Sequence, residues 1–126
     1  MFAELGVTLQ VLAPGQPSTL HHAEEAQEDF LVLAGECLLL VEGQERRLAA
    51  WDFFHSPPGT EHGFVGAGDG PCAILAVGRR IAGRGIVYPR SMLALGHGAG
   101  VESGTRSPQE AYTPFGHWRP GRAAWG

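Results

Sequence analysis

Two short segments of the chain carry the residue types that bind divalent metal ions. One runs from His22 to Glu28 as His-Ala-Glu-Glu-Ala-Gln-Glu, and the other runs from Pro57 to His62 as Pro-Pro-Gly-Thr-Glu-His. Imidazole nitrogens and carboxylate oxygens are common protein ligands of such ions. Because several predicted strands separate the two segments, only the fold can bring them together.

The two-residue period of a β-strand predicts which of these side chains share a space. His22 and Glu24 are two residues apart and therefore point to the same side of a strand. If Phe30 faces the interior, Glu28 does so as well. Burying a carboxylate costs several kcal/mol unless it is paired, protonated or bound to a cation. We therefore expect a cation beside His22, Glu24 and Glu28, with Glu24 as a possible proton carrier.

His62 follows the turn Pro57–Gly59, whose two prolines and one glycine restrict the backbone. A metal site needs ligands held on rigid supports, so we predict His62 as a further ligand. His55 precedes the same turn. We expect it to be a packed strand residue, with proton transfer in the pocket as the alternative.

Composition predicts one globular domain and excludes several functions. The chain has 126 residues, of which 44% are hydrophobic, as expected for a single core. The net charge of -4 gives no basic face for nucleic acid. Lysine is absent, which excludes Schiff-base chemistry on a lysine.

Neither a signal peptide nor a membrane-spanning apolar stretch is visible in the sequence. Cys37 and Cys72 lie in apolar runs without metal-binding spacing, so we expect two small buried thiols. These features predict a cytoplasmic protein that binds neither membrane nor nucleic acid.

Short apolar runs between glycines and prolines predict an all-β sandwich or barrel. A tight hairpin is expected at Glu42-Gly43, and Trp51, Phe53 and Phe54 are expected in the core. The predicted strands are Gly6–Leu12, Ser18–Ala23, Glu28–Leu33, Cys37–Val41, Gln44–Leu48, Phe53–His55, Gly63–Val65 and Cys72–Val77.

The spacing of the candidate ligands resembles the two motifs of the cupin superfamily, over roughly Pro14–Val77. The first cupin motif runs Gly-x5-His-x-His-x3,4-Glu-x6-Gly, and here Glu28 is followed after six residues by Gly35. The second runs Gly-x5-Pro-x-Gly-x2-His-x3-Asn. Here Pro57–His62 matches its centre, whereas Gly66 stands in place of Asn.

The first motif departs from the family because no His-x-His is present. In one register, His22-x-Glu24 replaces the histidine pair. In the other, His21 is the first ligand and Ala23 stands where the second would be. We prefer the first register because it keeps four ligands. Gln27 is a lesser candidate if the strand slips by one residue. The predicted metal ligands are therefore His22, Glu24, Glu28 and His62.

Glu28 also has a simpler interpretation, as the partner of Arg46 or Arg47 in an ion pair.

The resemblance implies a cupin-type double-stranded β-helix, or jelly-roll barrel, with an apolar pocket. We expect residues 1–78 to form this barrel and residues 79–126 to form a C-terminal extension. Short helices are expected at Ser91–Leu95 and from Ser107 onward, where Ser-Pro-Gln-Glu resembles a capping box. The aromatic residues after Tyr112 are expected to cover the barrel or a partner subunit, which favours a homodimer.

The resemblance further implies one divalent metal ion. Zinc is expected in the isolated protein, with iron, manganese or nickel as alternatives. The expected function is metal-dependent chemistry on a small molecule, of the dioxygenase, isomerase or lyase type. The alternative is a non-catalytic module that binds a small ligand or a structural metal.

Overall fold

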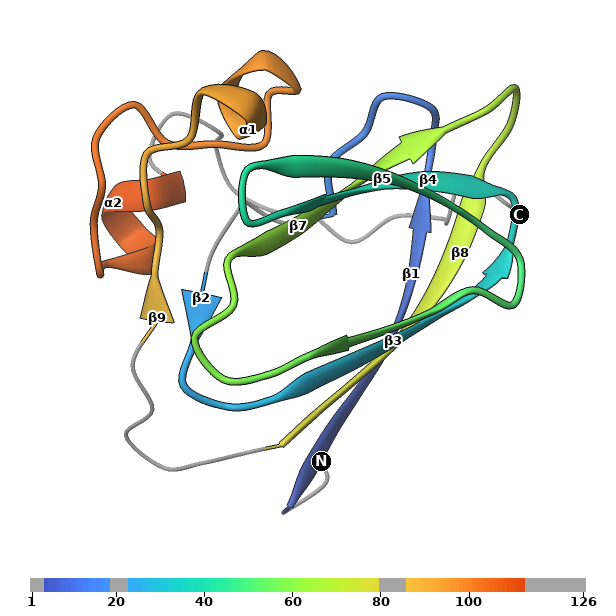
Figure 1. The fold of residues 1–126 in the computed structure, drawn as a ribbon, viewed down its shortest axis with the longest axis horizontal. Coiled ribbons are helices and arrows are strands. Elements are labelled where there is room, and N and C mark those ends of the chain that lie inside the picture. Colours follow the sequence, from blue (N-terminus) through green and yellow to red (C-terminus); the bar gives the residue numbers. More distant parts are fainter. Residues whose placement is uncertain (1–3, 19–22, 80–85, 113–126) are drawn as a thin grey trace.

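A computed structural model of the chain describes residues 4–18, 23–79 and 86–112 (Figure 1). Its strands are β1 (Leu5–Leu12), β2 (Ala23–Glu24), β3 (Glu28–Ala34), β4 (Glu36–Val41), β5 (Gln44–Ala49), β6 (Phe53–Ser56), β7 (His62–Ala67), β8 (Cys72–Arg79) and β9 (Ile86–Val87). Its helices are α1 (Met92–Gly96) and α2 (Pro108–Tyr112).

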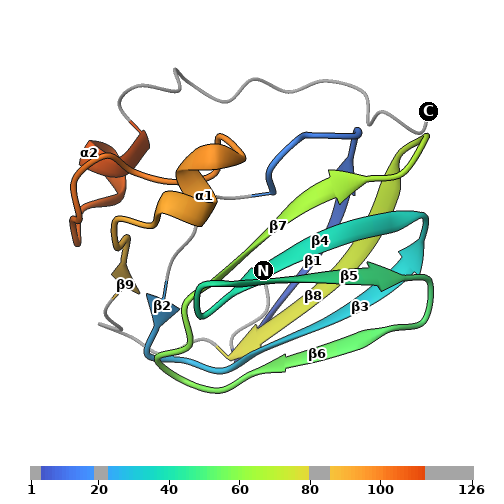
Figure 2. The same cartoon turned by 45° about the horizontal axis from the view of Figure 1, so that its top comes forward.

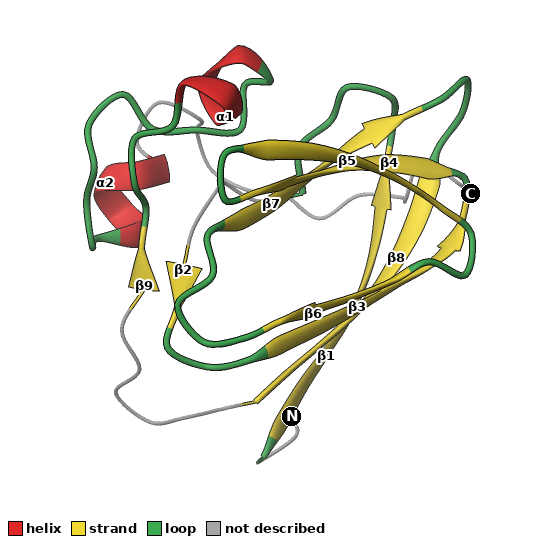
Figure 3. Ribbon diagram, viewed as in Figure 1, coloured by secondary structure: helices red, strands yellow, loops and turns green. Residues whose placement is uncertain are grey.

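Two antiparallel sheets face each other and enclose the interior (Figures 1 and 2). The first has the strand order β1-β8-β3-β6, and the second has the order β5-β4-β7. A separate two-stranded ribbon joins β2 to β9 at the end where the two helices lie (Figure 3). The predicted all-β, jelly-roll architecture is confirmed.

Alternation along the strands places one set of side chains between the sheets. Phe30 and Val32 of β3 are 5% and 1% exposed, and they share a core cluster with Leu39 and Phe64 of the second sheet. The rings of Phe30 and Phe64 lie with their centroids 4.7 Å apart. Interdigitation of this kind joins the two sheets into one core.

The predicted hairpin at Glu42-Gly43 is confirmed. Both residues have positive φ values, 47° and 76°, as a type I′ turn requires. The predicted strand Ser18–Ala23 is described only at Ser18, just after the bridge of Pro17 to Val65, and at Ala23, where β2 begins. Positions 19–22 lie outside the described residues.

The two predicted helices are also confirmed. The amide of Ala94 donates to Ser91 Oγ at 3.2 Å, which caps α1. Ala94 packs with Leu40 and Val65 on the outer face of the second sheet. The aromatic residues after Tyr112 lie outside the described residues. No helix in the described part of the chain is long and apolar enough to cross a membrane.

The expectation that Trp51 and Phe53 lie in the core is wrong. Trp51 is 75% exposed and Phe53 is 61% exposed. Phe53 pairs with Leu31 on the outer face of β6, so alternation turns Phe54 inward instead, where it packs against the core.

The expectation for the cysteines is confirmed, since both are free thiols with no exposed surface. Burial, with smaller effects of the neighbouring Cys72 and Asp52, raises the pKa of Cys37 to about 12. Burial also raises the pKa of Cys72. Neither thiol is therefore poised as a nucleophile or a metal-binding thiolate.

We expect both thiols to resist alkylation in the folded protein. At about pH 8, iodoacetamide should add to neither Cys37 nor Cys72, because each thiol is buried and protonated; both should react after denaturation. Intact-mass measurement gives the count of adducts. Rapid modification of the native protein would contradict this.

Gly66 in β7 is held against the loop that follows β1. Its amide donates to Gln16 O at 2.9 Å, and its carbonyl accepts from the amide of Gly15 at 2.8 Å. A Cβ at position 66 would lie 2.1 Å from the carbonyl oxygen of Ala13. The close approach of two backbones therefore requires glycine here.

We expect Gly66→Ala to lower the free energy of unfolding by about 1–3 kcal/mol, the usual cost of overpacking. Gly70→Ala is the matched control, because a Cβ there meets nothing within 4 Å. Denaturant unfolding compares the two variants. Equal stability of both would show that the loop moves aside without cost.

Candidate metal centre

His62 is held in one orientation at the start of β7. Its side chain is 3% exposed, and Nδ1 lies 3.0 Å from the carbonyl oxygen of Thr60 and 3.2 Å from Ser56 Oγ. Because a carbonyl oxygen only accepts, Nδ1 carries the hydrogen. In the neutral imidazole, Nε2 then carries the lone pair that a metal ion needs.

Glu28 supplies a carboxylate directly opposite that nitrogen. Its Oε1 lies 3.0 Å from His62 Nε2, and its side chain is 18% exposed. Glu28 begins β3 and pairs with Ser56 of β6, so both side chains point inward from the first sheet. The contact thus joins β3 of one sheet to β7 of the other.

The distance between the two atoms of this contact is compatible with both of them binding one divalent ion. A lone pair and a carboxylate oxygen 3.0 Å apart repel each other unless a proton or a cation lies between them. Two ligand atoms, each about 2.1 Å from one octahedrally coordinated ion and about 90° apart, are themselves separated by about 3.0 Å. The pair of Glu28 and His62 is therefore suited either to an ion pair or to shared coordination.

The fold also joins the two segments that carry the predicted ligands. The amide of Gly59, in the proline turn, donates to the carbonyl of Glu24 at 2.7 Å. The Oε2 atom of Glu24 is buried. Within residues 4–18, 23–79 and 86–112, no group of three or more His, Cys, Asp or Glu side chains is arranged to hold a metal ion.

The structure thus brings Glu28 and His62 into contact and places Glu24 beside the proline turn. His21 and His22 lie outside the described residues. The full set of His22, Glu24, Glu28 and His62 stays a prediction.

Glu28 faces the interior, away from Arg46 and Arg47 of β5, so neither of these two arginines is its ion-pair partner. Arg47 instead pairs with Glu36 of β4, with Nε 3.1 Å from Oε2. Arg46 donates to Gln44 at 3.3 Å.

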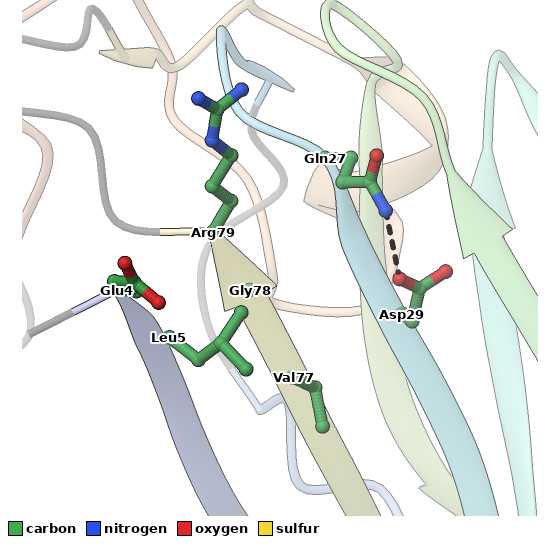
Figure 4. A pocket seen from close by; sticks show the side chains of 7 residues that line it. All are labelled: Glu4, Leu5, Gln27, Asp29, Val77, Gly78 and Arg79. Carbon is green, nitrogen blue, oxygen red and sulfur yellow. Dashed lines mark hydrogen bonds between the residues drawn. The ribbon is translucent and has the colours of Figure 1, made fainter. Parts of the chain in front are cut away.

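His55 and Gln27 contribute to the opposite, outer face of the first sheet. His55 Nδ1 lies 2.5 Å from Asp29 Oδ1, and its side chain is half exposed. Gln27 donates to Asp29 Oδ2 at 3.2 Å, in a cavity on that face (Figure 4). Both expectations for His55 are wrong, the packed residue and the proton carrier in the pocket, because alternation in β6 turns Ser56 inward.

A cavity of about 400 Å³ opens beside the two segments. Its described lining includes Glu24, Gly59, Val87 and Arg106. Charged side chains of both signs therefore line it beside apolar ones such as Val87 and Pro58. Arg106 lies in the C-terminal extension, and no sequence pattern connects it to the barrel. Ser56 was also not predicted as a site residue, although its position directly before the proline turn could have indicated it.

Aromatic rings surround the buried imidazole. Phe30 and Phe54 meet His62 edge to face, with ring centroids 5.4 and 6.1 Å away. These rings cover the His62 side of its contact with Glu28, where reduced contact with water strengthens electrostatic interactions.

Comparisons with solved structures return proteins of one fold. A protein provisionally described as a sugar phosphate isomerase, from Acidithiobacillus ferrooxidans, is 27% identical with a TM-score of 0.66, over 69% of this chain and 57% of that one. A sugar phosphate isomerase of the cupin superfamily from Silicibacter pomeroyi is 31% identical with a TM-score of 0.63, over 68% and 56%. The DMSP lyase DddQ from Ruegeria pomeroyi is 27% identical with a TM-score of 0.56, over 66% and 42%.

The chain therefore spans little more than half the length of the first two of these structures, and less than half of the third. None of the curated protein sequences compared with the chain matches it significantly. The family model for the cupin domain matches residues 8–78, which run from within β1 to within β8 and include Glu28 and His62. On this match and the jelly-roll fold, the chain belongs to the cupin domain family.

Proposed function

We propose that this protein is a metal-dependent cupin that acts on a small molecule. His62 and Glu28 would hold one divalent ion, together with His22 and Glu24. The observation that carries the proposal is the buried 3.0 Å contact between His62 Nε2 and Glu28 Oε1.

The surroundings of this contact support a functional role. Removing charged or polar groups from water is costly, and such groups are often retained in a core because function requires them. Here the imidazole is 3% exposed and lies against the rings of Phe30 and Phe54. A well-packed apolar pair would stabilise the barrel as well or better.

The described residues on either side of positions 19–22 support the inclusion of His22. The amide of Ser18 donates to the carbonyl of Phe64 at 2.9 Å, two residues from His62 in sequence. The carbonyl of Glu24 accepts from Gly59, three residues from His62. The chain between Ser18 and Ala23, which contains His21 and His22, thus joins two points that both neighbour His62.

Each residue has a part in the proposed chemistry. Thr60 and Ser56 orient the imidazole through Nδ1, and Glu28 sets the charge opposite Nε2. A bound divalent ion would supply Lewis acidity toward a substrate oxygen or activate water. The cavity with Glu24 and Arg106 would admit the small molecule, with Arg106 available to an anionic group.

The reaction type is proposed only as a class. The names of the similar structures make isomerisation and lyase action candidates beside dioxygenation, and one fold hosts many chemistries. Zinc fits imidazole and carboxylate ligands, and iron, manganese and nickel remain alternatives. The free thiols of Cys37 and Cys72 support a reducing, cytoplasmic setting.

A second candidate is a non-catalytic module with a closed, structural metal site. The close approach of Phe30 and Phe54 to His62 favours it, because these rings leave little room beside the imidazole. An exchangeable ligand position separates the two candidates. Azide should change the visible spectrum of the cobalt-loaded protein if the site is catalytic, and an unchanged spectrum indicates a closed shell.

We expect His62→Ala and Glu28→Gln each to weaken metal binding by more than about 100-fold. The reason is that losing a supporting residue alone typically costs 10- to 100-fold, and a ligand matters more. Metal content after dialysis and titration with Zn²⁺ measure the effect, and circular dichroism checks folding.

His55→Ala is the matched control, because it removes a histidine paired with a carboxylate on the outer face of the same sheet. Its metal content should equal that of the wild type. Equal metal content in all three variants, or a wild type that binds no metal, would exclude the proposed centre.

The same titration distinguishes the two registers of the first motif. With His22 as ligand, His22→Ala should lose metal as strongly as His62→Ala, while His21→Ala should bind normally. The reverse result would select the other register. Glu24→Gln should weaken binding only if Glu24 completes the set.

A further inference from the structure

We propose that the cavity beside the proline turn binds a small zwitterion, a molecule that carries one ammonium and one carboxylate group as an amino acid does. This is the cavity of about 400 Å³ whose lining includes Glu25 and Arg106. That the zwitterion is the substrate rests on the proposed function, whereas its binding to the cavity does not.

Two opposite charges line this cavity without pairing to each other. Glu25 and Arg106 are exposed, and neither makes a hydrogen bond or an ion pair within the part of the chain that the structure describes. Elsewhere on the molecule such groups do pair, as Arg47 does with Glu36. A carboxylate and a guanidinium that line one cavity without meeting can each form a charge-assisted hydrogen bond with a ligand that carries both charges.

The backbone places Arg106 in one row with apolar residues of the cavity. Ala23 of β2 is opposite Val87 of β9 in the ribbon at the end of the barrel (Figure 3). Tyr88, which follows β9, forms an antiparallel bridge with Thr105 through two backbone hydrogen bonds of 2.7 and 3.0 Å. In this register Arg106 comes opposite Val87. Ala23, Val87 and Arg106 therefore share one row, and all three line the cavity.

The residues on either side of Arg106 are joined to α2. Thr105 Oγ1 donates to Glu110 Oε2 at 2.7 Å and accepts from the amide of Ser107 at 3.0 Å. Ser107 Oγ accepts from the amide of Glu110 at 3.3 Å. These bonds hold the backbone of Arg106 in place before a ligand arrives, which lowers the entropy cost of binding.

Glu25 belongs to a second fixed segment, at β2 and the proline turn. It follows Glu24, whose carbonyl accepts from the amide of Gly59 at 2.7 Å. Pro58 and Gly59 line the cavity next to it. Two strand spacings, about 10 Å in all, separate β2 from the backbone that carries Arg106. The two charges therefore come from different strands, with space for a ligand between them.

The volume and the remaining lining define the ligand class further. About 400 Å³ lies near the lower end of the range for small-molecule sites, which indicates a compact ligand. The side chains of Ala23, Pro58 and Val87 offer apolar contact to a short carbon skeleton.

The chemistry of the two charged groups favours an ammonium and a carboxylate. Proteins typically enclose a quaternary ammonium in aromatic rings, and the described lining of this cavity contains none. The cation that fits beside Glu25 is therefore an ammonium with N–H donors. The guanidinium of Arg106 matches a carboxylate through two parallel N–H···O bonds.

The test is calorimetric titration of the full chain at neutral pH with L-alanine, β-alanine and γ-aminobutyrate, in which the two charges are progressively farther apart. Propionate and propylammonium are the probes that carry one charge each. At least one zwitterion should bind about 10-fold more tightly than both of these, because it makes both charge-assisted contacts. If no zwitterion binds more tightly than the singly charged probes, the proposal is overturned.

Two variants locate the binding. Arg106→Gln and Glu25→Gln should each raise the dissociation constant of that zwitterion about 10-fold, since each removes one charged contact. Both side chains are exposed, so the fold should tolerate the changes, which circular dichroism verifies.

Arg46→Gln and Glu102→Gln are the matched controls, because Arg46 lies on β5 and Glu102 lines a different cavity. Both should bind the zwitterion as the wild type does. Undiminished binding in Arg106→Gln and Glu25→Gln, or an equal loss in the controls, would overturn the assignment to this cavity.

Metal content, measured on the same samples, separates this result from the proposed function. Zwitterion binding to a protein that holds no metal would uphold the cavity as a binding site and exclude the metal centre. A protein that holds metal but binds no zwitterion would overturn the binding site alone.

Discussion

The register of β3 between β8 and β6 determines which side chains meet inside the barrel. β3 pairs with both neighbours, and this pairing turns Glu28, Phe30 and Val32 inward. Asp29 and Leu31 then face outward. A slip of one residue would exchange the two sets, placing Asp29 against His62 and exposing Phe30. The contact between Glu28 and His62 therefore depends on this register.

Two pairs of histidine and carboxylate lie on opposite faces of this sheet and differ mainly in burial. In both, a ring nitrogen approaches a carboxylate oxygen, at 3.0 Å for His62 and Glu28 and at 2.5 Å for His55 and Asp29. The inner imidazole is 3% exposed and the outer one 50%. Water screens the outer pair, so this pair contributes little to the stability of the fold. The inner pair is buried, where any charge must be balanced by a partner.

Much of the fold could be predicted from the sequence, because it rests on local signals. Alternation located the strands, Glu42-Gly43 marked the hairpin, and Ser91 and Ser107 marked the helix starts. His62 and Glu28 were predicted because a rigid turn and a strand register fix them. His55 was misjudged because its direction depends on which of two adjacent residues turns inward, which β6 alone does not decide.

Other features depend on contacts distant in sequence. Arg106 reaches the cavity beside Glu24 only because the C-terminal extension returns to the barrel. Phe53 and Trp51 were expected inside because aromatic residues usually are, yet the inner positions of β6 belong to Phe54 and Ser56. Such outcomes follow from competition for limited interior space, which composition does not reveal.

Gly66 gives the departure from the second cupin motif a different meaning. When this motif position is considered alone, glycine in place of Asn suggests that a functional side chain has been lost. In the fold, the backbone from Ala13 to Gln16 occupies the space that a side chain at position 66 would need. The same loop forms hydrogen bonds with both the amide and the carbonyl of Gly66. A relative with a larger residue here must carry a differently shaped loop after its first strand. A substitution at position 66 is therefore expected to require a compensating change in the loop from Ala13 to Gln16.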